Sequence, residues 1–328
     1  MNPLIDSYIQ YVSTVRRYSP NTQAVYRDVL EEYASYSLEA PYDADGLAAS
    51  LAPTPLRNYE VHLMEERKLG SRTVNLHLSV LSGFCRYLMT QGRLKSNPVR
   101  LITRPKTEKR LPEFYRDDAM EEYFKNTEYV LSEDSLELLQ SLRPEDKRLA
   151  GELYGRILRR LIVSFLHGTG IRRAELASLN VGNVDSSRNV LTVRGKGDKM
   201  RDVPMVPALV TEVGRYMQAA EAFFGGAPAA GDPLLRTPSG RRLYPVYIDR
   251  AVKEELGSIQ EITGRKSPHV LRHTLATELL NDGSDLNAIK ELLGHSSLAA
   301  TQVYTHNSIE KLKSVYEKAH PRAKDPSD

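Results

Sequence analysis

Residues 169–175 read TGIRRAE, and the interpretation of the C-terminal half of this chain depends on them. The strongly apolar run 154–166 before them predicts a buried helix, and the Gly168-Thr169-Gly170 turn then leads into the next helix. Arg172 and Arg173 would point about 100° apart on that helix, so only one of them could face a given site. Glu175 stands three residues after Arg172, a spacing that also suits an ordinary surface ion pair.

Four further short stretches carry polar groups. The stretch 195–199 reads GKGDK and predicts a turn between two β-strands, where exposed lysines are common. It is not a nucleotide-binding P-loop, because Asp198 stands where a serine or threonine is required. The other three stretches are 269–273 (HVLRH), 293–295 (LGH) and 304–306 (YTH).

His269, Arg272 and His273 are spaced to share one face of a helix that begins at Ser267-Pro268, so two imidazoles and a guanidinium group are expected together on that face. The pair could be packed or capping histidines, or zinc ligands. Zinc is disfavoured because Val270 replaces the glutamate of the His-Glu-x-x-His motif and Arg272 would repel a dication. His295 follows Gly294, so it could also be a histidine at a helix C-terminus, where the helix dipole favours it.

These residue types match what cutting a DNA backbone requires. Phosphodiester transfer places negative charge on the non-bridging oxygens, and planar guanidinium groups stabilise that charge best. The site also needs a nucleophile, and an acid for the departing 5′ oxygen. A tyrosine nucleophile has an ordinary pKa near 10, so its phenolate costs about 4 kcal/mol at pH 7 and needs nearby cations.

In this order and at these spacings, the five stretches resemble the tyrosine recombinase, or phage integrase, family. Residues 293–306 match the pattern L-G-H-x5-T-x-x-Y-x-H at every fixed position. The resemblance implies that Tyr304 attacks the phosphate and forms a 3′-phosphotyrosyl link. It implies that Arg172, Arg272 and His295 hold the non-bridging oxygens and that Lys196 protonates the leaving 5′ oxygen.

The same resemblance implies lesser roles for four other residues. His269 would assist proton transfer, Glu175 and His273 would support the site, and Lys199 is a less favoured substitute for Lys196. The implied reaction needs no metal and no nucleotide, because the phosphotyrosyl bond keeps the energy of the ester.

Composition sets the general class. The chain has 328 residues, of which 41% are hydrophobic and 27% charged, as in soluble proteins with two domains. No apolar run is long enough to cross a bilayer, and the first residues lack the pattern of a signal peptide. Cys85 is the single cysteine and lies in an apolar helical pattern, which predicts a buried thiol. These features predict a cytoplasmic protein.

The expected fold is mainly α-helical with a small antiparallel sheet. Residues 1–99 predict four main helices, which the resemblance identifies as a SAM-like DNA-binding domain. Residues 100–112 are a basic, proline-containing linker, and 113–319 form the catalytic domain, followed by a polar tail over 320–328. Strands are expected at 190–193 and 201–205, the second at an edge because of Pro204. Helices are expected at 207–224, 247–259, 268–280, 285–293 and 308–318.

Basic side chains are crowded near the linker, although the net charge of the chain is only +3. Charge alone favours a solvated linker, whereas a segment that lies against DNA phosphates is the functional alternative. The residues concerned are Arg93, Lys95, Arg100, Arg104, Lys106, Lys109 and Arg110.

The helix expected at 308–318 and the His320-Pro321 that follows resemble the Xer subgroup, which resolves chromosome dimers. This implies a recombinase acting on a specific double-stranded DNA site, with four protomers, identical or paralogous, on two duplexes and that helix docked on a neighbour. A septal DNA translocase is a further implied partner. Segment 116–150 looks longer than in Xer proteins, and integrases of mobile elements share all the motifs. A type IB topoisomerase and a catalytically silent DNA-binding protein are the remaining alternatives.

Overall fold

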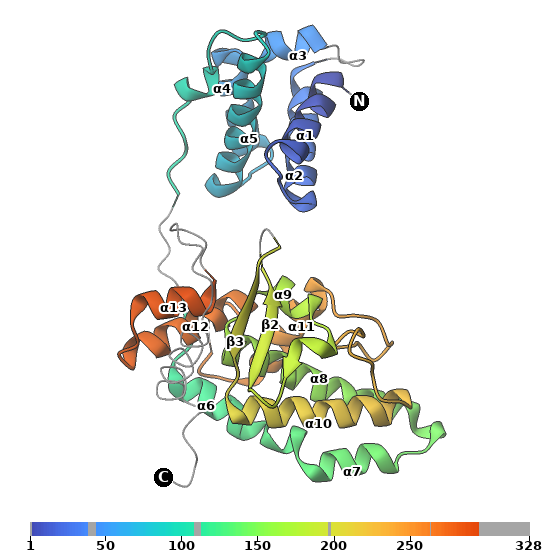
Figure 1. The fold of residues 1–328 in the computed structure, drawn as a ribbon. Coiled ribbons are helices and arrows are strands. Elements are labelled where there is room, and N and C mark those ends of the chain that lie inside the picture. The colour runs from blue at the N-terminus through green and yellow to red at the C-terminus, as the bar shows by residue number, and fades with distance from the viewer. Residues whose placement is uncertain (1, 39–43, 108–112, 196–197, 263, 295–328) are drawn as a thin grey trace. The chain divides into compact units, whose positions relative to one another are not determined.

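The computed structural model describes residues 2–38, 44–107, 113–195, 198–262 and 264–294. Its internal contacts divide the chain into two compact units, Met1–Arg110 and Leu111–Asp328 (Figure 1). The division falls inside the segment 100–112 that we expected to be a linker. No helix in the described ranges has the length and apolar character needed to span a membrane.

The first unit is helical. Its α-helices are α1 (Pro3–Thr14), α2 (Pro20–Ser37), α3 (Ala44–Ser50), α4 (Pro53–Val61) and α5 (Ser71–Thr90). A π-helical turn (His62–Glu66) extends α4, and a 3₁₀ turn (Pro98–Leu101) follows α5. The side chains of Asn2 and Ser19 cap the first two helices by accepting hydrogen bonds from backbone N–H groups. The four main helices are present as predicted, whereas the short helix α3 was not predicted.

The second unit is mainly helical as well. Its α-helices are α6 (Asp117–Asn126), α7 (Glu133–Ser141), α8 (Lys147–Thr169), α9 (Arg173–Ser178), α10 (Pro207–Phe224), α11 (Pro245–Glu255), α12 (Pro268–Asn281) and α13 (Leu286–Leu293). Short 3₁₀ turns are formed by Glu128–Leu131, Pro144–Asp146, Val181–Asn183 and Leu256–Ser258. Helix α8 packs against α10, α11 and α12, and its apolar face is fully buried. The long apolar run seen in the sequence is therefore the central helix of this unit.

Three antiparallel strands form the sheet, in the order β1 (Val184–Asp185), β2 (Val190–Arg194) and β3 (Met200–Pro204) (Figure 1). In the register of β2 and β3, Leu191 pairs with Val203 and Val193 pairs with Arg201. β3 is an edge strand, as Pro204 predicted, and the expected mainly helical fold with a small antiparallel sheet is confirmed. The two-residue strand β1 was not predicted, because it is too short to show alternation.

The C-terminal ends of α8 and α13 meet, and of the turn expected at residues 168–170 only Gly170 lies beyond α8. Helix α8 ends at Gly170 with φ of +60°, and α13 ends at Gly294 with φ of +65°. This backbone region favours glycine. A Cβ on Gly170 would lie only 2.6 Å from Cδ2 of Leu293, so the last turn of α13 packs directly on the end of α8.

Candidate active site

Arg172 stands at the point where the chain enters α9. We expected it inside the first turn of the helix, but it is the N-cap residue with extended backbone, and α9 begins at Arg173. The Glu175 carboxylate accepts a hydrogen bond of 2.8 Å from the Arg172 backbone N–H and one of 2.9 Å from its Nη1. Glu175 therefore caps the helix and also holds the Arg172 side chain. The ordinary i,i+3 pair exists, but it forms part of a larger cluster.

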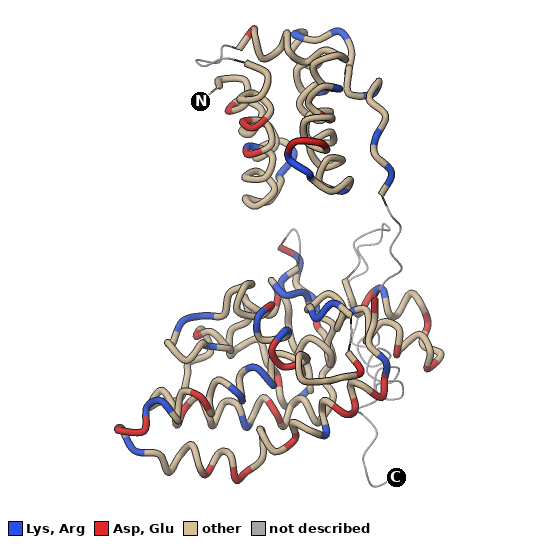
Figure 2. The backbone as a smooth tube through the Cα atoms, turned by 180° about the vertical axis from the view of Figure 1, so that it is seen from behind, with Lys and Arg blue, Asp and Glu red and all other residues tan. Residues whose placement is uncertain are grey.

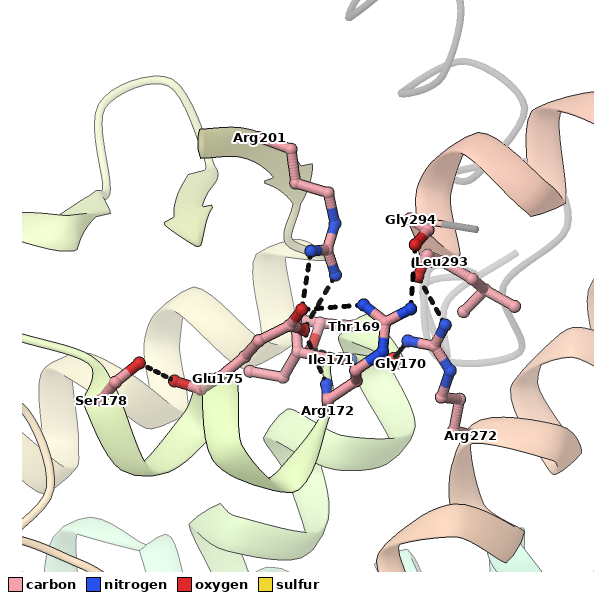
Figure 3. Close-up of polar contacts among 10 residues, drawn as sticks. All are labelled: Thr169, Gly170, Ile171, Arg172, Glu175, Ser178, Arg201, Arg272, Leu293 and Gly294. Atoms are coloured by element: carbon pink, nitrogen blue, oxygen red, sulfur yellow. Dashed lines mark hydrogen bonds and ion pairs between the residues drawn. The ribbon is translucent and has the colours of Figure 1, made fainter. Parts of the chain in front are cut away.

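Arg173 does not join that cluster. Its guanidinium group pairs with Asp249 of α11 on the exposed surface. Arg172 instead directs Nη2 to the carbonyl oxygen of Gly294, at 2.8 Å, while 41% of its side chain stays exposed (Figure 3). Neighbouring residues of the same type thus have different partners, because Arg172 is the extended N-cap residue and Arg173 is the first residue of the helix.

Arg272 reaches the same place from α12. Only 6% of the residue is exposed, and its Nη1 and Nη2 each donate a hydrogen bond of 2.5 Å, to the carbonyl oxygens of Gly170 and Leu293 respectively (Figure 3). Burial, and then the positive charge of Arg172, lower the pKa of Arg272 to about 10. The acceptors are carbonyls at the C-terminal ends of α8 and α13, where the helix dipole concentrates negative partial charge.

A third arginine, Arg201 of β3, completes the cluster, and sequence reasoning did not select it. Its Nη1 and Nη2 donate to the two carboxylate oxygens of Glu175, both at 2.9 Å (Figure 3). Burial by itself would raise the pKa of the Glu175 carboxyl, but the hydrogen bonds from Arg201 and Arg172 bring it below its usual value. Glu175 is therefore an anion shared by two guanidinium groups. Glu175, Arg172, Arg201 and Arg272 together are called the Glu175 cluster.

A signal for Arg201 was present in the strand pattern. Side chains alternate between the faces of a strand, so Arg201 shares its face with Val203, which is fully buried. Its side chain is only 9% exposed. An arginine at an inward position of a short strand needs a buried anion, and this requirement pointed to a carboxylate such as Glu175.

His269 and His273 lie on the exposed side of α12, with ring centroids 5.1 Å apart. Arg272 turns to the buried side, so the three groups are not presented together on one surface as we expected. Burial, followed by the charges of His273 and Arg272, lowers the pKa of His269 below its usual value. Among the residues that the structure describes, no three His, Cys, Asp or Glu side chains are placed to hold a metal ion.

Several predicted residues fall outside the described ranges. These are Lys196, His295, Tyr304, Lys109 and Arg110, together with the helix expected at 308–318 and the tail. The remaining linker cations Arg93, Lys95, Arg100, Arg104 and Lys106 are exposed in the first unit. Cationic positions recur along the segment that follows α5 (Figure 2). Arg104 bonds the Ser79 hydroxyl at 2.8 Å and Arg93 pairs with Asp45 at 3.2 Å, so these two have contacts of their own.

A cavity of about 910 Å³ opens elsewhere in the second unit, among α7, α8 and the end of α10. Apolar residues such as Leu139, Leu142 and Phe223 line it together with basic ones such as Arg148. None of the arginines of the Glu175 cluster lines this cavity. The cavity and the cluster are therefore separate features of the second unit.

Comparisons with known proteins bear on what such a cluster does. The sequence profile described as "Phage integrase family" matches residues 146–311, and "Phage integrase, N-terminal SAM-like domain" matches residues 5–92. Tyrosine recombinase XerC of Pelobacter propionicus is 33% identical over 99% of this chain and 99% of its own length. The protein of the same name from Chlorobaculum parvum is 31% identical over 97% of this chain and 94% of its own.

Solved structures share the fold. A lambda integrase tetramer bound to a Holliday junction superposes with a TM-score of 0.61, at 16% identity over 92% of this chain and 79% of that chain. The Tn1549 transposon integrase in complex with transposon right end DNA gives a TM-score of 0.60, at 19% identity over 95% of this chain and 97% of that chain. Given the family profiles, the full-length relatives and the shared fold, this chain belongs to the phage integrase family and is a site-specific tyrosine recombinase.

Proposed function

We propose that the Glu175 cluster is the phosphate-binding half of the recombinase active site and that Tyr304 is its nucleophile. Tyr304 attacks the scissile phosphate in line, giving a 3′-phosphotyrosyl link and a free 5′-hydroxyl. Arg172 and Arg272, together with His295, hold the non-bridging oxygens, where negative charge grows in the transition state. A 5′-hydroxyl from the partner strand then reverses the step.

The convergence of Arg172 and Arg272 on the end of α13 supports this proposal most directly. The two residues lie 100 positions apart in sequence, and they bind the carbonyls of the adjacent residues Gly294 and Leu293. His295 comes next in the chain, and Tyr304 follows nine residues later. We infer that the guanidinium groups gathered at Leu293 and Gly294 supply the cations that favour the Tyr304 phenolate.

We assign the general acid to Lys196. Gly195, the residue before it, lies beside the cluster, because a Cβ there would be 3.4 Å from Nη1 of Arg201 and 3.7 Å from Oε1 of Glu175. We infer that Lys196, the next residue along the chain, reaches a phosphate bound at Arg172. His269 assists proton transfer, since its lowered pKa keeps the imidazole neutral at neutral pH. Glu175 and His273 support the site.

The DNA partner is a double-stranded recombination site, gripped in part by the exposed cations Lys95, Arg100 and Lys106 of the first unit. Two duplexes bound by four protomers, identical or paralogous, form the reacting assembly. Resolution of chromosome or plasmid dimers is the role we propose, in a cytoplasmic setting and with a septal DNA translocase as activator. The near full-length similarity to proteins named XerC supports it.

Replacing Tyr304→Phe tests the nucleophile. The variant is expected to bind a labelled candidate site as the wild type does and to form no covalent adduct on a nicked suicide substrate. Tyr129→Phe is the matched control, because Tyr129 is 53% exposed in the second unit and lies outside the cluster. Adduct formation by Tyr304→Phe would remove Tyr304 from this role, and relaxation of supercoiled plasmid without a specific site would indicate a type IB topoisomerase instead.

A further inference from the structure

Arg201 has no part in the reaction just described, yet it makes the best-formed ion pair of the cluster. Its two terminal nitrogens each donate to a different oxygen of Glu175, and the two side chains are 9% and 5% exposed. A planar, two-point arginine–carboxylate pair fixes orientation as well as distance. Lysine could not reproduce it, because an ammonium group is a single point of charge.

The position of Arg201 connects three elements. It belongs to β3, it binds Glu175 of α9, and its guanidinium group packs on the end of α13 (Figure 3). A Cβ added to Gly294 would lie 3.0 Å from both Cζ and Nε of Arg201, so no space is left between the side chain and that backbone. Arg201 therefore contacts two segments. One is the beginning of α9, next to Arg172, and the other is the end of α13 at Gly294.

Arg201 also stands at the base of the hairpin turn. The backbone N–H of Gly195 donates to the carbonyl oxygen of Lys199 at 2.8 Å, which closes the turn over residues 195–199. Arg201 follows two residues later, opposite Val193 in β2. The other ion pair of this hairpin joins Arg194 and Asp198, and both side chains are 67% exposed. Exposed pairs contribute little to holding a geometry, so the buried Arg201–Glu175 pair is the anchor.

We propose that Arg201 is a positioning residue, which fastens the 195–199 hairpin to Glu175 so that Lys196 reaches the leaving 5′ oxygen. This inference rests on the proposed function, because it requires Lys196 to be the general acid. In this proposal the nearly buried Arg201 acts through Lys196 and not by binding the DNA. A misplacement of about 1 Å at a reacting group costs on the order of a hundredfold in rate, so loosening this anchor slows the acid-dependent step.

Arg201→Lys keeps the charge and loses the two-point geometry. With an ordinary phosphodiester suicide substrate, we expect single-turnover cleavage to slow by about tenfold to a hundredfold, with unchanged DNA affinity. With a 5′-bridging phosphorothiolate, whose leaving group needs no acid, the variant should cleave at nearly the wild-type rate. Equal slowing on both substrates, or no slowing on either, would overturn the proposal.

Arg188→Lys is the matched control. Arg188 pairs with Asp185 at 2.7 Å at the opposite end of β2 and is 53% exposed. It is an arginine of the turn between β1 and β2 with a carboxylate partner, and it is not a member of the cluster. Its replacement should leave the cleavage of both substrates unchanged. A thermal unfolding scan of each variant shows whether a rate change comes from lost folding, which would lower the rate on both substrates alike.

A double-mutant cycle gives the second readout. If Arg201 acts only through Lys196, Arg201→Lys has no further effect once Lys196 is removed, so the double variant cleaves ordinary DNA as slowly as Lys196→Ala alone. A double variant slower by the full Arg201→Lys factor would contradict the inference. The comparison of the double variant with Lys196→Ala does not depend on how strongly Arg201→Lys alone slows cleavage.

The same experiments separate this inference from the proposed function. If the wild type forms no adduct, or if Lys196→Ala is not rescued by the phosphorothiolate, the assigned nucleophile or acid is wrong. If Lys196→Ala is rescued and Arg201→Lys is not, the active site stands as proposed and only the positioning role of Arg201 falls.

Discussion

The Arg172 guanidinium group donates a hydrogen bond of 2.8 Å from Nη2 to the carbonyl oxygen of Gly294, 122 residues further along the chain. This bond joins the beginning of α9 to the end of α13. It places the most exposed arginine of the cluster beside the residue that precedes His295. Any displacement of either helix end therefore changes both the phosphate-binding side chain and the start of the segment that carries Tyr304.

Arg172→Lys should abolish most of the cleavage activity. The change keeps one positive charge but loses the fork that holds Glu175 and Gly294, and loss of one well-placed donor costs about a hundredfold to a thousandfold in rate. Arg173→Lys is the control, since Arg173 is the adjacent residue and pairs with Asp249 outside the cluster. Rates of adduct formation on a suicide substrate measure both. Comparable losses of cleavage rate in the two variants would show that Arg172 has no special role in the reaction.

Cleavage should fall on the acid side of neutrality because His269 becomes protonated there. Its pKa is lowered by burial, then by His273 and Arg272, so the imidazole is neutral at pH 7 and the loss sets in below its usual value near 6.5. Single-turnover rates between pH 5 and 8 should show this decline. His269→Gln should remove it. His273→Gln should move the decline to higher pH, because the His273 imidazole no longer opposes protonation of His269. An unmoved profile would contradict the assignment of the decline to His269.

Gly170→Ala should destabilise the second unit. The backbone at this position has φ of +60°, and the new Cβ would lie 2.6 Å from Cδ2 of Leu293 and 3.0 Å from Cδ2 of Leu275. Strain of this kind costs about 1–3 kcal/mol. Gly214→Ala is the opposite case, because nothing lies within 4 Å of a Cβ there and α10 should gain about 0.5–1 kcal/mol. Urea unfolding of both variants measures whether the free energy of unfolding falls or rises. An unchanged value for Gly170→Ala would show that α13 shifts without cost to make room for the new Cβ.

Removing one member of the buried Arg160–Glu212 pair should be costly. Their side chains are 3% and 10% exposed, and Nη2 of Arg160 lies 3.2 Å from Oε1 of Glu212. Glu212→Leu leaves a buried cation, at a cost of about 3–5 kcal/mol, whereas Arg160→Met combined with Glu212→Leu should recover most of it. Urea unfolding measures each variant. The exposed pair Arg148–Glu152 provides the control, and a double variant no better than Glu212→Leu would refute the charge-burial explanation.

Much of the fold could be predicted from the sequence, because the helices and strands depend on local patterns of residues. The apolar run before Gly170 gave α8, and proline at the first position of a helix marked the start of α10 and α12. Pro204 placed β3 at the edge of the sheet. The short elements α3 and β1 were missed, since seven and two residues are too few to establish a period against their surroundings.

The site could be predicted only in part, because only some of its residues lie in local sequence patterns. Arg172, Glu175 and Arg272 stand in compact motifs, so their identity and order along the chain were enough to select them. Arg201 stands in no such motif. Its partner Glu175 is 26 residues away, and the pair exists only because β3 is folded back beside α9.

By itself, the sequence determined the family of this protein, because the five short stretches stand in the order and at the spacings of that family's motifs. The tertiary structure alone decided that Arg172 rather than Arg173 enters the cluster, that Arg272 points inward while His269 stays exposed, and that Glu175 is shared by two arginines. Those outcomes depend on which distant backbone carbonyls and carboxylates packing brings within hydrogen-bonding distance, and no local pattern encodes a contact across 100 residues.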